Sequence, residues 1–336
     1  MQLPLPLRQA AEDAILAEEI APVLVVGPTA SGKTELALAL ARALGGEVVS
    51  ADSRQVYREL RAGTAKPVCD PQGRVEAIPY HLVDCVPVAE PFDAGRFAAL
   101  ARARIAEIRG RGRVPIVAGG TGLYIRALLE GLCELPPRDE ALRRRLAEEA
   151  RVQGRARLHE RLRRVDPEAA AAIPANNIQR VVRALEVYEL TGRPISSHWR
   201  EDKKLSGGRL VPAAIFRIDW PPEILRQRIA ARAKLMWPKM LSEVEELLRR
   251  FTGEEPGFQS LGYPEAVACA RGRLSSEEGL RRLISSTCAY ARRQRTWFRH
   301  QVAAAALAGG RPEDMLAGAL SLIPERRSPA SCSISV

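Results

Sequence analysis

The stretch that decides the fold is PVLVVGPTASGKTELALALARAL, residues 22–44. Residues 22–26 are a short apolar run rich in β-branched side chains, which predicts a buried strand, and the apolar spacing of residues 35–44 predicts a helix. The eight residues between them match GxxxxGK followed by Ser or Thr, and they are Gly27, Pro28, Thr29, Ala30, Ser31, Gly32, Lys33 and Thr34. A chance turn before an ordinary helix is the alternative, but strand, loop and helix follow in the order that a phosphate-binding loop requires.

This loop predicts a diphosphate site. In such loops the backbone N–H groups surround phosphate oxygens, and the N-terminus of the following helix adds a favourable dipole. We expect Lys33 to neutralise phosphate charge and the Thr34 hydroxyl to hold Mg²⁺.

Further strand and helix signals alternate along the chain. Strands are predicted at 47–50, 81–86, 114–118 and 210–218, and helices at 93–109, at 277–299 and at 222–250 with an interruption at Pro238. Alternation of this kind implies a parallel sheet, whereas the arginine-rich residues 139–190 show helical signals alone. We therefore expect a P-loop NTPase-like α/β core of parallel strands flanked by helices in residues 21–136 and 205–310. An all-helical insertion at 137–204, an N-terminal extension at 1–20 and a flexible tail at 311–336 complete the prediction.

Charge points to an anionic partner. The net charge is +11 with a pI near 9.8, which suits nucleic acid or a diphosphate compound, although a solvated basic surface is the alternative. Residues 138–164 hold ten arginines against five acids, and residues 279–312 hold seven arginines and no acid. The six cysteines lack CxxC spacing, the first twenty residues include acids, and the apolar runs are too short to span a bilayer. We expect a reduced, cytoplasmic protein without a membrane role and without a cysteine metal cluster.

Asp52 is the candidate catalytic carboxylate. A hydrolytic P-loop enzyme carries a metal-steering acid at the end of another strand, but residues 114–118 lead into Gly119-Gly120-Thr121-Gly122. Asp52 follows the second predicted strand, and ligands of open α/β sheets bind at the carboxyl ends of strands, so Asp52 should face Thr34 as a base beside a phosphate. The alternative is that Asp52 or Ser53 caps a helix.

Seven ordered blocks resemble the tRNA dimethylallyltransferase family, the bacterial isopentenyltransferases, over nearly the whole chain. The blocks are GPTASGKT at 27–34, SADSRQVYRELRAGTAKP at 50–67, HLVD at 81–84, GGTGLYIRALLEGL at 119–132, RALEVYELTGRPIS at 183–196, LGYPEA at 261–266 and RRQRTWFR at 292–299. Two positions depart from the usual pattern: Asn177 stands where the family has Asp, and Met240 where it has Gly.

The resemblance implies transfer of a dimethylallyl group from dimethylallyl diphosphate to the exocyclic N6 amine of the adenosine on the 3′ side of a tRNA anticodon. The loop, residues 27–34, would hold the diphosphate and Mg²⁺ without hydrolysing ATP. Asp52 would take a proton from the amine, while Thr34 and Arg232 would stabilise the leaving diphosphate. An exocyclic aromatic amine is a poor nucleophile until its proton is accepted, which agrees with this allocation.

The same resemblance implies a set of contacts with the tRNA anticodon stem-loop. The residues for the target nucleotide are Asp52, Ser53, Arg54, Gln55 and Thr121. The residues for the rest of the tRNA are Arg143, Gln179, Arg180, Val181, Val182, Arg183, Arg292, Arg293, Gln294, Arg295, Thr296, Trp297, Phe298 and Arg299. For Arg143, Arg180 and Arg183 the alternative is pairing with Glu148, Glu149 or Glu186 on a solvated helix face, and for Trp297 and Phe298 it is core packing.

Two other functions fit the same residues. A P-loop kinase, or an isopentenyltransferase acting on free adenine nucleotides, would use the basic segments to clamp phosphates. A non-catalytic RNA-binding module would bind tRNA without turnover. We expect the protein to be a monomeric enzyme. His81 either orients a neighbouring group or is a hydrogen-bonded core histidine.

Overall fold

The computed structural model describes residues 20–133, 135–205 and 210–323. These form two compact units, one from residues up to Leu129 together with residues from Leu210 onward, and one from Glu130–Arg209. The N-terminal extension expected at 1–20 lies, apart from residue 20, outside the described residues.

Within the described residues the first unit is built on a seven-stranded sheet of order β3-β4-β2-β5-β1-β6-β7. The strands are β1 (Val23–Val26), β2 (Gly46–Ser50), β3 (Arg74–Val75), β4 (Ile78–His81), β5 (Val114–Gly119), β6 (Ala214–Asp219) and β7 (Ala305–Ala308). All neighbours are parallel except the β3–β4 hairpin. Strands β2, β5 and β1 lie side by side in that order and are parallel, so the loops that follow them emerge at the same edge of the sheet.

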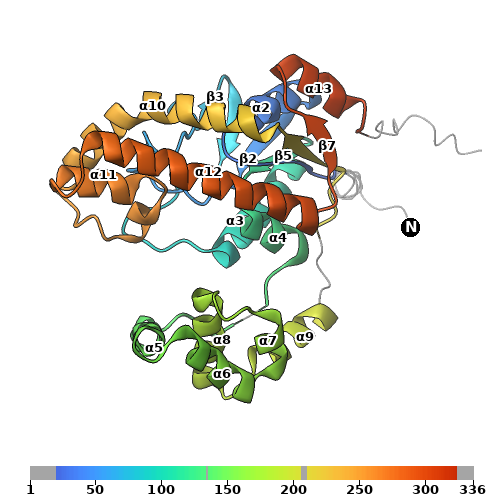
Figure 1. The fold of residues 1–336 in the computed structure, drawn as a ribbon. Coiled ribbons are helices and arrows are strands. Elements are labelled where there is room, and N and C mark those ends of the chain that lie inside the picture. Colours follow the sequence, from blue (N-terminus) through green and yellow to red (C-terminus); the bar gives the residue numbers. More distant parts are fainter. Residues whose placement is uncertain (1–19, 134, 206–209, 324–336) are drawn as a thin grey trace, which may run out of the picture. The chain divides into compact units, whose positions relative to one another are not determined.

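Helices cover both faces of the sheet (Figure 1). Val23 and Val25 of β1 face a core shared with α2 (Lys33–Leu44) and α13 (Pro312–Leu320). Leu24 and Val26 face the opposite core, which includes α3 (Ala94–Gly110), α4 (Gly122–Glu130) and Phe298 of α12 (Ser276–Gln301). Strands β1 and β5 are buried along their whole length, which is why their sequences are apolar throughout.

A third core lies beside the sheet. It joins α10 (Pro222–Leu247), η1 (Pro256–Gln259), α11 (Tyr263–Ala270) and α12 to the segment that follows β2, through buried side chains such as Leu60, Met240 and Tyr263. Helices α10 and α12 run side by side (Figure 1). Helix α10 continues through Pro238, so the predicted interruption there is wrong.

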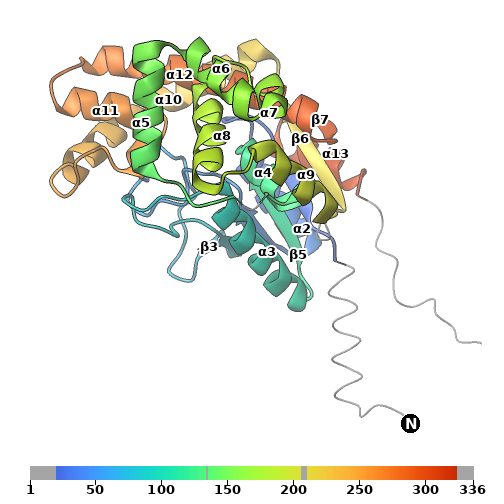
Figure 2. The ribbon, with the colours of Figure 1, turned by 90° about the horizontal axis from the view of Figure 1, so that it is seen from below.

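The second unit is a helical bundle with its own core, drawn in green shades in Figure 2. It contains α5 (Glu140–Gln153), α6 (Arg155–Val165), α7 (Pro167–Ala172), α8 (Ile178–Thr191) and α9 (Ile195–Leu205). The buried carboxylate of Asp166 joins two of them, because its Oδ1 accepts the N–H of Ala169 at the start of α7 and its Oδ2 accepts the N–H of Ser196 in α9, each at 2.9 Å.

The structure corrects three expectations. The strand predicted at 81–86 is wrong, because Leu82 and Asp84 have φ values of +61° and +56°, in the left-handed region that a strand excludes. The strand β4 lies earlier, at Ile78–His81, and the strand predicted from residue 210 begins only at Ala214. The tail expected from 311 is wrong in its first part, because α13 buries Met315 against α2, while residues 324–336 lie outside the described residues.

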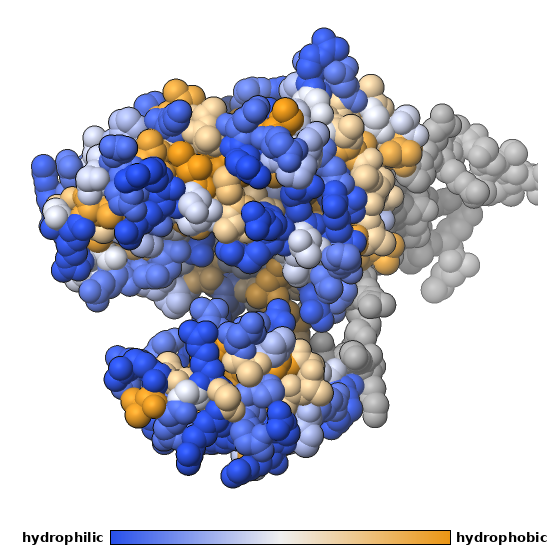
Figure 3. Space-filling model, viewed as in Figure 1, coloured by the Kyte–Doolittle hydropathy of each residue, from blue (hydrophilic) through white to orange (hydrophobic). Residues whose placement is uncertain are grey.

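On the surface shown in Figure 3 hydrophilic and hydrophobic residues are interspersed. Among the described residues, no helix combines the length and the apolar character needed to cross a membrane.

Candidate active site

The loop between β1 and α2 has the geometry of an anion site. Gly27, Ala30 and Gly32 have φ values of +151°, +63° and +95°, so the backbone curls tightly before α2 begins at Lys33. A Cβ at Gly27 would lie 3.2 Å from the carbonyl oxygen of Ile218, so this glycine is required by the close approach of β6. The Ser31 hydroxyl is buried and has no hydrogen-bond partner among the described residues. A phosphate oxygen would satisfy this buried group.

Lys33 points back over the loop. Its Nζ donates to the carbonyl oxygen of Pro28 at 2.6 Å. The pKa of Lys33 is lowered to about 8, chiefly by burial, with Arg232 acting in the same direction and the negative charges of Asp52 and Glu35 opposing the shift. A pKa lowered by desolvation means that the ammonium lacks a full counter-charge, which the oxygens of a phosphate would supply.

Helix α10 fixes the outer side of the loop with two guanidinium groups. Arg232 Nη2 donates to Thr29 Oγ1, which places the predicted Arg232 at the phosphate loop. Arg228, one turn earlier, donates from Nε to the Ala30 carbonyl at 2.8 Å, and its guanidinium lies 4.6 Å over the Trp220 ring. Positive charge therefore reaches the loop from α10 as well as from Lys33.

Asp52 shapes a turn immediately after β2. Its Oδ1 accepts the N–H of Arg54 at 2.9 Å, and the residues that follow are turns, so the alternative that it caps a helix is wrong. Asp52 acts electrostatically on both Lys33 and Arg232. The structure thus brings the carboxylate and the phosphate loop together, as the sequence predicted.

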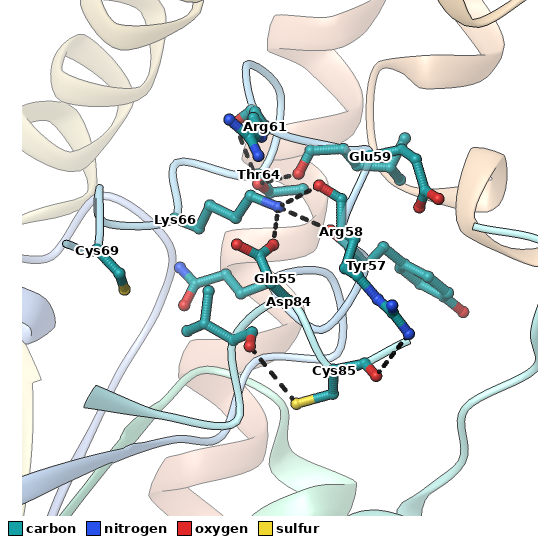
Figure 4. Close-up of polar contacts among 12 residues, drawn as sticks. Gln55, Tyr57, Arg58, Glu59, Arg61, Thr64, Lys66, Cys69, Asp84 and Cys85 are labelled. Atoms are coloured by element: carbon teal, nitrogen blue, oxygen red, sulfur yellow. Dashed lines mark hydrogen bonds and ion pairs between the residues drawn. The ribbon is translucent and has the colours of Figure 1, made fainter. Parts of the chain in front are cut away.

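A polar cluster holds the segment behind Asp52 (Figure 4). The side chain of Lys66 is almost fully buried; its Nζ pairs with Asp84 and donates to the carbonyl oxygen of Tyr57 at 2.7 Å. The backbone N–H of Asp84 donates to the Gln55 carbonyl at 3.1 Å, and Ser50 Oγ donates to Gln55 Oε1 at 2.9 Å. These hydrogen bonds hold both the backbone carbonyl and the side-chain amide of the buried Gln55.

Thr121 holds Asp52's loop from the end of β5. Its Oγ1 accepts the N–H of Ser53 at 3.0 Å and donates to Ser53 Oγ at 3.3 Å. Tyr290 of α12 hydrogen-bonds Thr121, and burial raises the pKa of this tyrosine, which keeps it protonated. The predicted residues Ser53 and Thr121 therefore meet, although they lie 68 positions apart.

These elements enclose a cavity of about 750 Å³. Its lining includes the phosphate loop, Asp52 and Gln55 together with apolar side chains such as Met236, Leu261 and Leu283. A lining of this mixed character suits a ligand with a diphosphate head and a small apolar group.

The donors at the loop suit Mg²⁺. Thr34 and Asp52 both line the cavity and offer oxygen ligands, which Mg²⁺ prefers. The buried Tyr80 of β4 hydrogen-bonds Thr34, and burial raises the pKa of this phenol. In the part of the chain that the structure describes, no group of three or more His, Cys, Asp or Glu residues is arranged so that it could hold a metal ion. A magnesium ion would therefore take most of its ligands from the diphosphate and water, which fits the site.

Comparison with known proteins gives the family. The model of the family described as IPP transferase matches residues 55–301, and that described as isopentenyl transferase matches residues 21–75. A protein of Anaeromyxobacter dehalogenans (strain 2CP-C), named tRNA dimethylallyltransferase, is 50% identical over 284 residues, covering 83% of this chain and 92% of that protein.

The chain belongs to the IPP transferase family.

Two solved structures support the same family assignment. The tRNA isopentenylpyrophosphate transferase of Bacillus halodurans matches with a TM-score of 0.65 and 32% identity, covering 91% of this chain and 97% of that one. A eukaryotic dimethylallyltransferase described as acting on tRNA matches with a TM-score of 0.72 and 26% identity, covering 90% of this chain and 77% of that one. The α/β core of this IPP transferase is P-loop NTPase-like, as the sequence predicted.

In α12 the structure separates the residues predicted to contact the tRNA backbone. Arg292, Arg293, Thr296 and Arg299 are not buried, and neither is Arg295. Phe298 is fully buried, and Trp297 packs on it edge to face at 5.0 Å, as the core-packing alternative held. Gln294 is also buried. The prediction is therefore wrong for the side chain of Phe298, because its burial leaves it no surface for tRNA, whereas Gln294 lines the cavity.

In the helical unit, too, some of the residues predicted to contact the tRNA are exposed and others are buried. Gln179 and Arg180 are exposed, but Val181 and Val182 pack in the core of the unit, which corrects the prediction that their side chains contact tRNA. Glu186 is fully buried. Its Oε2 pairs with Arg183 at 2.7 Å and lies 4.0 Å from Arg143. Pairing with Glu186, the alternative considered for these arginines, is thus present.

Several residues near the site escaped sequence reasoning. Arg228 could have been found, because it stands four positions before Arg232 and so shares its helix face. Tyr80, Tyr290 and Lys66 gave no local signal, because their roles depend on contacts made only in the folded chain. His81 is partly exposed and its ring pairs with the buried Glu47 at 2.7 Å, so it is hydrogen-bonded, as one of the two alternatives held, but it does not lie fully in the core.

Proposed function

We propose that this protein transfers the dimethylallyl group of dimethylallyl diphosphate to the exocyclic N6 amine of the adenosine 3′-adjacent to the anticodon of a tRNA. The observation that carries the proposal is one cavity lined by both the phosphate loop and Asp52. At the end of β5, where a hydrolytic enzyme would carry a metal-steering acid, this chain has Gly119, Gly120 and Thr121. Relatives named tRNA dimethylallyltransferase support the same reaction.

In this reaction the adenine amine attacks the first carbon of the dimethylallyl group. A bond forms between that nitrogen and carbon while the bond from carbon to the diphosphate oxygen breaks. The amine loses a proton, and Oδ2 of the Asp52 carboxylate accepts it. The Arg54 N–H donates to Oδ1 and so keeps the carboxylate oriented. The electron pair of the broken bond leaves with the diphosphate.

The leaving diphosphate is held by charges already in place. Backbone N–H groups of the loop, Lys33 and Arg232 surround the oxygens where negative charge grows in the transition state. Mg²⁺ bound at Thr34 would neutralise further charge on the diphosphate. Arg228 adds a second guanidinium from the same face of α10.

The acceptor must leave its stack to reach Asp52, which is easier in an RNA loop than in a duplex. Exposed arginines of α12, together with Arg180 and Gln179 of the helical unit, would bind phosphates and sugars of the anticodon stem-loop. Residues Ser53, Arg54, Gln55 and Thr121 would contact the target nucleotide. We propose a monomer that works in the cytoplasm.

The test is nucleoside analysis of unmodified tRNA after incubation with the protein, Mg²⁺ and labelled dimethylallyl diphosphate, with AMP and ADP offered in parallel. We expect label in an N6-substituted adenosine of tRNA and none in the free nucleotides. Labelling of AMP or ADP instead would show the small-molecule isopentenyltransferase. Salt-dependent tRNA binding without any transfer would leave a non-catalytic RNA-binding module.

A further inference from the structure

Gln294 joins two loops that are far apart in the chain. It lies on α12, and its side chain is 7% exposed. Its Oε1 accepts the backbone N–H of Thr29 in the phosphate loop at 2.9 Å, and its Nε2 donates to the carbonyl oxygen of Gly120 after β5 at 2.7 Å. One planar amide thus spans partners that stand 265 and 174 positions away from it.

The Gly120 side of this bridge continues to Asp52. Thr121 follows Gly120, donates its N–H to the Ala51 carbonyl at 3.4 Å, and accepts the Ser53 N–H at its hydroxyl at 3.0 Å. Ala51 and Ser53 flank Asp52 in the chain. A continuous path of hydrogen bonds and peptide bonds therefore leads from the phosphate loop through Gln294 to the carboxylate.

Close packing keeps this path short. A Cβ at Gly120 would lie 2.4 Å from Gln294 Nε2 and 3.1 Å from the carbonyl oxygen of Gly27. A Cβ at Gly119 would lie 2.1 Å from the carbonyl oxygen of Ala51. The three loops after β1, β2 and β5 thus touch through backbone at this point, and the Gln294 amide fills the gap between the first and the third.

We propose that Gln294 is a positioning residue that sets the distance between the bound diphosphate and Asp52. Gln294 lines the cavity, but both polar atoms of its amide are engaged by Thr29 and Gly120, and it acts through Thr29 and through Gly120 with Thr121. This inference rests on the proposed function, because the two loops carry the donor and the base of that reaction. Transfer requires the adenine amine and the allylic carbon to be closely aligned. Loss of the bridge therefore lowers kcat and leaves both substrates binding almost as before.

Two variants separate the two hydrogen bonds. Gln294→Met keeps the length and bulk of the side chain and removes both bonds. Gln294→Glu keeps the acceptor for the Thr29 N–H, but its carboxylate faces the Gly120 carbonyl without a proton to donate. Ile105→Val in the core of α3 is the matched control for lost stability, because Ile105 is buried in a core away from the cavity lining.

In prenyl-transfer kinetics we expect Gln294→Met to lose kcat by about tenfold to a hundredfold, with KM for donor and for tRNA each within about threefold of wild type. Ile105→Val should keep its kcat. Lowering the pH should protonate the carboxylate introduced by Gln294→Glu and restore the hydrogen bond to Gly120. The kcat of this variant relative to wild type, taken at saturating donor, should rise as the pH falls, while the ratio for Gln294→Met stays flat. Taking the ratio to wild type at each pH cancels the titration of other groups that line the same cavity, such as Lys33 and Tyr290.

Hydrogen exchange of the substrate-free protein measures the protection of the Thr29 amide by Gln294 independently of catalysis. The Thr29 amide should exchange about tenfold faster in Gln294→Met than in wild type, as expected for the loss of one buried hydrogen bond. An unchanged Thr29 amide would overturn the inference. So would a raised KM for tRNA with unchanged kcat, which would make Gln294 a tRNA contact, or an equal loss of kcat in Ile105→Val. Absence of transfer in the wild type would sink the proposed function alone, because the exchange of Thr29 still decides whether the bridge exists.

Discussion

The charge state of Lys33 should control how tightly the protein binds diphosphate between pH 7 and pH 9. Burial lowers the pKa of Lys33 to about 8, with Arg232 acting in the same direction and Asp52 and Glu35 opposing. A phosphate site needs the ammonium form, because neutral Lys33 loses its charge-assisted bonds to phosphate oxygens. Raising the pH through this pKa should therefore weaken binding.

The size of the effect follows from the titration. With a pKa near 8, about nine tenths of the Lys33 side chains are protonated at pH 7 and about one tenth at pH 9. If only the ammonium form binds, the apparent Kd rises about tenfold over this range, which corresponds to roughly 1.4 kcal/mol. Near pH 8 each binding event should also take up about half a proton, because bound phosphate raises the pKa of Lys33.

The assay is calorimetric titration with inorganic diphosphate and Mg²⁺ at pH 7, 8 and 9, repeated in buffers of different ionisation enthalpy to count protons. Diphosphate itself loses protons in this range, so Lys33→Arg is the matched control: its guanidinium stays charged throughout. We expect the wild type to lose about tenfold more affinity than the Lys33→Arg variant between pH 7 and pH 9. Equal slopes for the two proteins would refute the reasoning.

Three further predictions concern other parts of the molecule. Asp52→Asn should lower kcat for prenyl transfer, measured at saturating donor and tRNA, by on the order of a hundredfold to ten-thousandfold; full activity would remove Asp52 as the base. Glu186→Gln in the helical unit removes the charged partner that holds Arg183 in place, so Arg183 should be positioned less firmly for the tRNA. We expect tRNA binding in a filter assay to weaken by a few-fold without a change in KM for the donor, and unchanged tRNA affinity would contradict a positioning role for Glu186. Burial raises the pKa of Glu47, but hydrogen bonds from Arg111 and His81 outweigh it and leave the pKa below its usual 4.5. The resulting stability is present above pH 4.5 and is lost as the pH falls through the lowered pKa. Glu47→Gln should therefore lower the free energy of unfolding in urea by on the order of 1 kcal/mol at pH 7 and by progressively less in acid. A difference in unfolding free energy between the two proteins that does not vary with pH would exclude this account.

The phosphate loop was predictable because its sequence signature is local. Gly27, Gly32 and Lys33 act through the backbone conformation of eight consecutive residues, and the flanking strand and helix are visible as apolar spacing. Asp52 was predictable for a related reason. The carboxyl ends of parallel strands lie at one edge of the sheet, so a carboxylate just past β2 lies at the edge that carries the loop after β1, with only β5 between the two strands.

Secondary structure was misjudged where the apolar pattern continued through a turn. The run of residues 81–86 predicts a strand, but β4 lies at Ile78–His81 and ends there, because Leu82 and Asp84 adopt left-handed backbone conformations. These conformations place Asp84 where Lys66 can pair with it. Local periodicity carries no information about such a long-range ion pair.

What the sequence by itself determined is the chemistry available to this protein: a phosphate loop, a carboxylate beside it, and basic helices able to bind an anionic polymer. What only the tertiary structure decided is which residues of a basic or apolar run face outward. Arg292 and Gln294 are two positions apart in the RRQRTWFR block, yet the first is exposed and the second is buried between two loops. Helical spacing places Gln294 on the buried face of α12 with Ala291 and Phe298, but the partners that its amide meets there, Thr29 and Gly120, are far away in the chain and no spacing within the block encodes them.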